Sequence, residues 1–123
     1  MNRGFNLLVV EDTPIAQIAA KSILEHLGCQ VQIAANGTEA LAMFQANTYD
    51  LIFMDLGLPD ISGIEVTKEM RKLETSLAYT PIVALTANYD PKSKGILLEA
   101  GMDEFLEKPL TKENAHMILT KFL

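Results

Sequence analysis

Short apolar runs alternate with helix-like segments along this whole chain, and that alternation limits the fold it can adopt. The first run, Leu7-Leu8-Val9-Val10, is continuously apolar, as expected of a strand buried on both faces of a sheet. The predicted strands span residues 6–10, 31–34, 51–54, 81–85 and 104–106. Strands that alternate with helices predict an α/β fold, in which a parallel sheet is covered by helices on both faces.

Helix signals fill the segments between these runs. The expected helix starts pair a capping residue with a proline, a glycine or a glutamate: Thr13-Pro14, Asn36-Gly37, Ser62 with Glu65, and Asp90-Pro91. Gly28 and Gly101 are expected to end the first and fourth helices. The positions expected to face the core are Ile15, Ile18, Ala19, Leu24 and Leu27; Leu41 and Phe44; Val66, Met70, Leu73 and Leu77; and Ala115, Ile118, Leu119 and Phe122.

Polar side chains stand where four of the predicted strands end. Asp55 closes one apolar run, and because a carboxylate is costly to bury, we expect it to serve chemistry. Ligands of parallel α/β sheets bind outside the carboxyl ends of the strands. The residues that this rule gathers on one rim are Glu11, Asp12, Asp55, Thr86 and Lys108.

Three acids on one rim predict a bound cation. Two carboxylates about 4 Å apart repel by roughly 4 kcal/mol at an effective dielectric of 20, so Glu11, Asp12 and Asp55 need a counter-charge. Oxygen ligands without histidine or thiolate select a hard divalent ion, and Mg²⁺ is the expected one. Asp55 is then the candidate nucleophile that takes a phosphoryl group, and Lys108 and Thr86 can donate to phosphoryl oxygens.

Length and composition limit the classes of protein to which this chain can belong. At 123 residues the chain is expected to form one domain, spanning residues 1–123. A net charge of −6 without a basic cluster argues against nucleic-acid binding. No apolar stretch reaches the roughly 18 residues that span a bilayer, so no membrane contact is expected. Cys29 is the single cysteine and is expected to fill space in the core. The cytoplasm is the expected location.

The motifs at the strand ends resemble the receiver (response-regulator) domain of two-component phosphorelays over essentially the whole chain. They are Val9-Val10-Glu11-Asp12, Phe53-Met54-Asp55 with Pro59 and Gly63, Thr86-Ala87 and Lys108-Pro109. The resemblance implies a single doubly wound (βα)5 domain, whose five-stranded parallel sheet has the flavodoxin-like order 2-1-3-4-5. It also implies that Asp55 accepts a phosphoryl group from a histidine kinase or a histidine phosphotransfer domain.

Further roles follow from the same resemblance. Glu11 and Asp12 would hold Mg²⁺ together with Asp55, and the Gly57 carbonyl would be a further ligand. Thr86 and Phe105 would form the switch pair, although Phe105 lacks the hydroxyl of a tyrosine, so packing alone would hold its inward state. The Lys108-Pro109 bond would be cis. A homodimer through the last two helices is a further possibility.

Several alternatives stay open at this level. The stretch from Met54 to Gly63 most resembles receivers of hybrid histidine kinases, but a stand-alone response regulator is the alternative. An aspartate-nucleophile phosphatase would need a second aspartate where Gly57 stands, and a nucleotide-binding module would need phosphate-cradling glycines after the first strand. The residues expected to be solvent-exposed polar groups are Asp60, Asp90 and Asp103, with Asp90 also a helix cap, and His26 and His116.

Overall fold

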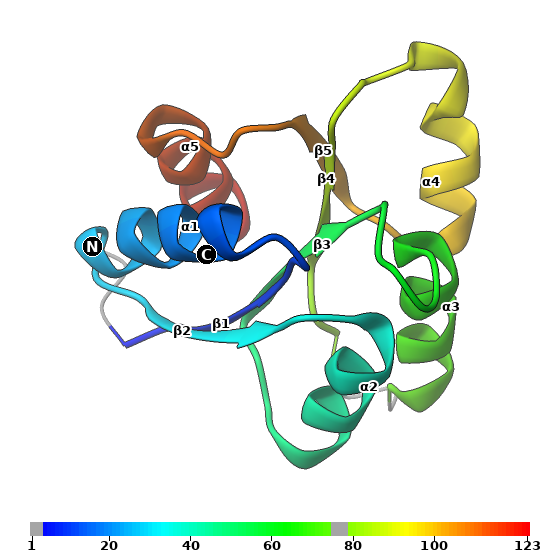
Figure 1. The fold of residues 1–123 in the computed structure, drawn as a ribbon, viewed down its shortest axis with the longest axis horizontal. Coiled ribbons are helices and arrows are strands. Elements are labelled where there is room, and N and C mark those ends of the chain that lie inside the picture. Colours follow the sequence, from blue (N-terminus) through cyan, green and yellow to red (C-terminus); the bar gives the residue numbers. More distant parts are fainter. Residues whose placement is uncertain (1–3, 75–78) are drawn as a thin grey trace.

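A five-stranded parallel sheet forms the centre of the computed structural model, which describes residues 4–74 and 79–123 (Figure 1). The strands are β1 (Asn6–Val10), β2 (Gln30–Ala34), β3 (Leu51–Asp55), β4 (Ile82–Thr86) and β5 (Glu104–Glu107). Their order in the sheet is β2-β1-β3-β4-β5, as the resemblance implies. Each predicted strand is present, with ends that differ from the prediction by at most one residue.

Helices cover both faces of the sheet. They are α1 (Pro14–His26), α2 (Gly37–Ala46), α3 (Gly63–Leu73), α4 (Lys94–Ala100), which follows a 3-10 turn at Pro91–Ser93, and α5 (Lys112–Phe122). α1 and α5 lie on one face, and α2, α3 and α4 lie on the other (Figure 1). Within the described residues, no helix is both long enough and apolar enough to cross a membrane.

Alternation along the strands divides the core into two layers. In β1, Leu7 and Val9 pack toward α1 and α5, whereas Leu8 and Val10 pack toward the other three helices. All five residues of β3 are buried, and burying each large apolar side chain contributes roughly 1.5–3 kcal/mol. The core on both sides therefore fixes the end of β3, where Asp55 lies.

α1 buries a different face from the one that carries Ile15 and Ile18. Ala20 and Leu24 are buried, whereas Ile15 and Ile18 are 80% and 70% exposed, and Ala19 is exposed as well. At 3.6 residues per turn, positions two and five residues before Ala20 fall on the opposite side of the helix. The prediction for Ile15, Ile18 and Ala19 was therefore wrong, and two large apolar side chains of α1 face solvent.

Most of the predicted helix ends are observed. Asn36 and Ser62 accept hydrogen bonds from the N–H groups of residues 39 and 65, as capping predicts. Thr13 precedes α1, but its hydroxyl makes no capping hydrogen bond. In α3, Leu73 is 45% exposed, contrary to the prediction, because the helix ends at this residue. The expected core position at Leu77 lies outside the described residues.

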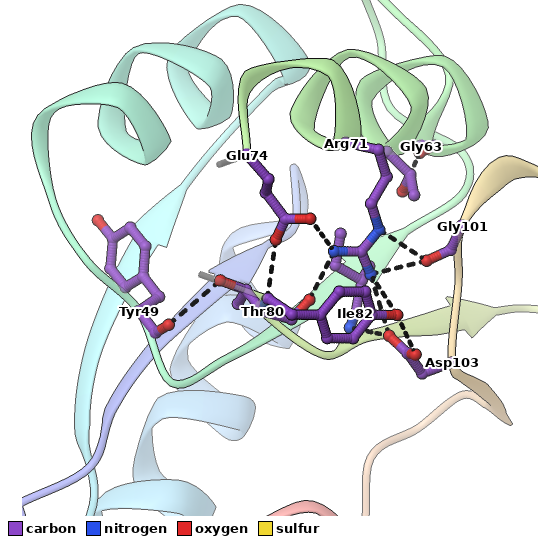
Figure 2. A network of polar contacts seen from close by, with 10 residues as sticks. Tyr49, Gly63, Arg71, Glu74, Thr80, Ile82, Gly101 and Asp103 are labelled. Atoms are coloured by element: carbon purple, nitrogen blue, oxygen red, sulfur yellow. Dashed lines mark hydrogen bonds and ion pairs between the residues drawn. The ribbon is translucent and has the colours of Figure 1, made fainter. Parts of the chain in front are cut away.

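A cluster of polar residues around Arg71 joins α3, α4, β4 and β5 at the amino ends of the strands (Figure 2). The Arg71 guanidinium donates to the Gly101 carbonyl (2.7 Å), the Thr80 carbonyl (2.8 Å) and the Asp103 carboxylate (3.0 Å). It also pairs with Glu74 at 2.8 Å. We call these five residues the Arg71 cluster. This cluster ties the end of α4 to the end of α3.

Asp103 is not the solvent-exposed loop residue that the sequence suggested. Its carboxylate accepts hydrogen bonds from the N–H of Ile82 (2.8 Å), from Arg71 and from the Tyr79 hydroxyl. Ile82 is the first residue of β4, so Asp103 connects the start of this strand to the segment before β5. A satisfied, half-buried carboxylate of this kind is a structural element of the fold.

Candidate functional site

The sheet brings the predicted site residues to one rim. Glu11 and Asp12 follow β1, Asp55 and Thr86 end β3 and β4, and Lys108 follows β5. All of them except the buried Glu11 line an open cleft of about 580 Å³ at the carboxyl edge of the sheet. The cleft is lined by Asp12, Thr13, Asp55, Leu56, Gly57, Thr86, Ala87, Asn88 and Lys108. Residues nearly a hundred positions apart in the sequence thus meet around one carboxylate, as predicted.

Lys108 bridges two buried carboxylates at the floor of this cleft. Its Nζ lies 2.6 Å from Glu11 Oε1 and 3.2 Å from Asp55 Oδ2. Glu11 and Asp55 are only 2% and 5% exposed, so the ammonium supplies charge compensation that water cannot. Charge-assisted contacts of this length position all three side chains.

Burial and mutual proximity shift the pKa values of these groups. Burial raises the pKa of Glu11, and the Asp55 carboxylate adds to the rise while Lys108 opposes it. Burial alone would raise the pKa of Asp55, but the Gly57 N–H, Glu11 and Lys108 outweigh it and lower the pKa. Burial alone would lower the pKa of Lys108, but both carboxylates outweigh it and raise the pKa. Asp55 is therefore ionised at neutral pH, as a nucleophile must be.

The three acids form a cluster that fits a hard divalent cation. One carboxylate oxygen from each of Glu11, Asp12 and Asp55 lies within 4.8 Å of the others. All three donors are oxygen atoms, and Asp12 is exposed at the mouth of the site. Mg²⁺ favours an incomplete set of carboxylate ligands, because it keeps several waters. The donor set therefore fits Mg²⁺.

Two glycines shape the backbone around Asp55. The Gly57 N–H donates to Asp55 Oδ1 at 3.0 Å, which holds the carboxylate from the loop side. A Cβ atom on Gly63 would lie 2.2 Å from the Asp55 carbonyl oxygen, so no other residue fits there without moving the strand end. The Gly63 N–H also donates to the Leu56 carbonyl at 3.1 Å. The loop between β3 and α3 is therefore closed tightly at its base.

Thr86 is the last residue of β4, and Phe105 lies in the neighbouring strand β5. The Thr86 hydroxyl donates to the Asn88 carbonyl at 3.1 Å, so it is engaged by its own loop. Phe105 is half-buried and stacks on Tyr89, with ring centroids 5.1 Å apart and an interplanar angle of 13°. The sequence reasoning missed Tyr89, because a loop position three residues after Thr86 carries no periodic signal. The Lys108-Pro109 bond is cis, as the resemblance implied.

Asp60 is exposed, as predicted, but it also makes hydrogen bonds that the sequence did not indicate. Its side chain accepts four hydrogen bonds, three of them from the start of α2. The hydroxyl of Thr38 and the N–H groups of Gly37 and Thr38 hold its pKa well below the ordinary value. An aspartate in a loop that reaches a helix 22 residues earlier has no signature in a single sequence.

A larger hollow lies elsewhere and contains none of the predicted site residues. It has a volume of about 700 Å³ and lies where β1 and β2 begin. Its lining includes Gln30, Gln32, Asn47 and Tyr49, without a cluster of charged groups. This hollow is larger than the cleft at Asp55, but the ionisable groups mark the cleft as the candidate functional site.

Comparison with known proteins agrees with this geometry. The family model of the response regulator receiver domain matches residues 7–120. The aerobic respiration control sensor protein ArcB of Escherichia coli K12 is 42% identical over 119 residues, which cover 97% of this chain and 15% of ArcB. The chain therefore spans a small part of that relative.

Comparison with solved structures also indicates a receiver domain. The receiver domain of the sensor histidine kinase PA1611 from Pseudomonas aeruginosa PAO1, with a magnesium ion in its active-site cleft, is 35% identical with a TM-score of 0.87. The match covers 97% of each chain. A chain in the co-crystal of Saccharomyces cerevisiae Ypd1 with the Ssk1 receiver is 33% identical with a TM-score of 0.89, covering 98% of this chain and 89% of that one. This chain belongs to the response regulator receiver domain family.

Proposed function

We propose that this domain is a phosphoacceptor that takes a phosphoryl group from a phosphohistidine onto Asp55. The observation that supports it is the Asp55 carboxylate in an open cleft, 3.2 Å from the Lys108 ammonium and within 4.8 Å of carboxylate oxygens of Glu11 and Asp12. A carboxylate oxygen of Asp55 forms a bond to phosphorus while the phosphorus–nitrogen bond of the donor histidine breaks. The products are an acyl phosphate on Asp55 and a free imidazole on the donor.

Glu11, Asp12 and Asp55 would hold Mg²⁺, with the Gly57 carbonyl as a further ligand. Bound there, the ion neutralises charge on the phosphoryl oxygens. Lys108 already contacts Asp55 and is placed to donate to a phosphoryl oxygen on that residue. The Thr86 hydroxyl would leave its bond to Asn88 and donate to a second oxygen, and Phe105 would move with it as the switch partner.

The phosphatase alternative is less well supported. A phosphatase that uses an aspartate nucleophile needs a second acid to shuttle the proton, and the residue two positions after Asp55 is Gly57. The acyl phosphate would therefore persist until water or a partner removes it, as a signal requires. We propose the signalling role for this reason.

We further propose that the domain is the receiver of a hybrid sensor histidine kinase. ArcB of E. coli and the kinase GacS of Pseudomonas protegens, which is 33% identical over 123 residues, support this assignment. The transcription factor SKN7 of S. cerevisiae is 32% identical over the same length, so a different output and a stand-alone regulator remain alternatives. Cytoplasmic location, a homodimer through the last two helices, and the lack of nucleic-acid binding stay predictions.

The exposed isoleucines of α1 suggest where a phosphodonor docks. Ile15 and Ile18 are largely exposed on a helix that begins two residues after Asp12. A small, mostly apolar hollow of about 100 Å³ is lined by alanines of the same helix together with Pro109 and Leu110. An apolar surface next to a reactive group fits a partner helix that presents its histidine to the cleft.

Replacing Ile18 with aspartate should slow phosphotransfer from a protein donor about tenfold, because a charge replaces an apolar contact. Phosphorylated Ypd1 serves as the first probe, and the rate is followed by loss of its phosphate. Labelling by acetyl phosphate, which needs no docking surface, should stay unchanged. The control is Ile96→Asp, an isoleucine of α4 that is 57% exposed. Equal rates for wild type and Ile18→Asp would place the donor elsewhere.

The proposed function is tested by incubating the chain with acetyl phosphate and Mg²⁺. The intact mass should rise by a single phosphoryl group, and hydroxylamine should remove it because the linkage is an acyl phosphate. Excess EDTA should reduce the labelling to background, because the acidic cluster then lacks its divalent ion. Labelling that survives hydroxylamine, or that ignores EDTA, would contradict this function.

A further inference from the structure

Asp60 connects the loop between β3 and α3, which follows Asp55, to the start of α2. Oδ1 accepts from the Gly37 N–H (2.8 Å), and Oδ2 accepts from the Thr38 N–H (2.9 Å) and the Thr38 hydroxyl (2.7 Å). Oδ1 also accepts from the N–H of the next residue, Ile61, at 2.8 Å. The carboxylate therefore bonds both to the start of α2 and to its own loop.

These bonds go beyond an ordinary helix cap. α2 already has a cap, because Asn36 accepts from the Glu39 N–H at 2.8 Å. Asp60 takes two further N–H groups of the first turn, where the helix dipole favours an anion. A Cβ atom on Gly37 would lie 3.2 Å from Ile61 Cβ and 2.7 Å from a methyl group of Val66. The start of α2 is thus seated closely against the loop and α3.

The same loop carries Gly57, whose carbonyl is the proposed fourth ligand. At its base, the loop is held by the bond between Leu56 and Gly63. Between them, the Gly57 N–H donates to Asp55 at the end of β3, and Asp60 makes the hydrogen bonds that reach α2. Without them, the middle of the loop would rely on the packing of Leu58 and Ile61 against the core.

We propose that Asp60 is a positioning residue, which fixes the loop between β3 and α3 so that Gly57 and Asp55 present their oxygens to Mg²⁺. This inference rests on the proposed function. Removal of a group that orients metal ligands typically weakens metal affinity by 10- to 100-fold. Because Asp60 acts on one backbone ligand from three residues away, we expect a loss near the lower value, about tenfold.

The test measures Mg²⁺ affinity by calorimetry on three folded variants and the wild type. Asp60→Asn keeps one acceptor oxygen, but its NH2 group then faces the N–H and O–H donors at the start of α2. Its Mg²⁺ affinity should therefore fall about tenfold. Thr38→Val removes the hydroxyl bond alone and should lower the affinity by a smaller factor. Asn36→Ala is the matched control, because it weakens α2 by removing its own cap but leaves the connection to the loop intact.

The outcomes distinguish a positioning role of Asp60 from an effect on the stability of α2. A weaker affinity in Asp60→Asn with a wild-type value in Asn36→Ala supports the positioning role. Equal losses in both variants would assign the effect to α2 stability and overturn it, as would an unchanged affinity in Asp60→Asn. Wild-type protein that neither binds Mg²⁺ nor becomes phosphorylated would instead refute the proposed function itself. Circular dichroism checks that each variant is folded. If Asp60→Asn does not fold, the Mg²⁺ affinity of Thr38→Val, compared with that of Asn36→Ala, tests the positioning role instead.

Discussion

Asp55→Asn should abolish phosphorylation by acetyl phosphate while leaving the domain folded. An amide is no nucleophile toward phosphorus, and the neighbouring Glu11 carboxylate is buried and paired with Lys108. Asparagine has nearly the same volume as aspartate, so the buried end of β3 keeps its packing. The change also removes one of two buried carboxylates in contact, and Lys108 still neutralises the other. Intact mass spectrometry measures the labelling, and circular dichroism measures the fold.

The control for this variant is Asp90→Asn. Asp90 is an exposed aspartate that accepts a hydrogen bond from the Lys92 N–H and lies outside the cleft. Its variant should be labelled like the wild type. If Asp55→Asn still gained one phosphoryl group at the wild-type rate, Asp55 would not be the nucleophile, and the phosphate would have to be located by peptide mapping.

Arg71→Met should lower the free energy of unfolding by roughly 3 kcal/mol, a large share of the 5–15 kcal/mol that holds a typical domain. Methionine keeps an apolar stem but leaves the Thr80 and Gly101 carbonyls without their donor. It also leaves Glu74 and Asp103 half-buried without their cation. Unsatisfied groups of this kind are costly, whereas loss of an exposed ion pair is not. Urea unfolding followed by circular dichroism gives the value.

Lys72→Met provides the matched comparison on the same helix. Lys72 pairs with Glu69 at 3.2 Å, but its side chain is 72% exposed, so its loss should change the stability by at most about 0.5 kcal/mol. Folded Arg71→Met protein should also accept phosphate normally, because its cluster lies at the opposite edge of the sheet from Asp55. Similar stability for the two variants would show that the Arg71 cluster contributes little.

The sheet and the rim could be predicted because both follow from short-range patterns. Runs such as Leu51–Met54 mark strands by composition alone, and parallel strands bring their carboxyl ends together by topology. Lys108 and Asp55 therefore meet without any knowledge of their contact. Capping residues such as Ser62 act on residues three positions away, so their effect is also visible in sequence.

The missed features depend on contacts between distant parts of the chain. The long-range hydrogen bonds of Asp60 and Asp103 were missed, because their partners at residues 38 and 71 are 22 and 32 positions away. In α1, the spacing of the apolar residues predicted that Ile15 and Ile18 face the core, but the helix packs by Ala20 and Leu24 instead. The face that a helix buries depends on the surface against which the helix packs. Other parts of the chain form that surface, so the sequence of the helix alone does not reveal it.

The ammonium that bridges Glu11 and Asp55 has a consequence for how this protein matures. Because Lys108 acts as an internal counter-ion, the acidic pair does not have to wait for a metal before the strands can close around it. We therefore expect the domain to fold with or without magnesium. Under the proposed function, the metal would be needed for the reaction at Asp55 and not for folding.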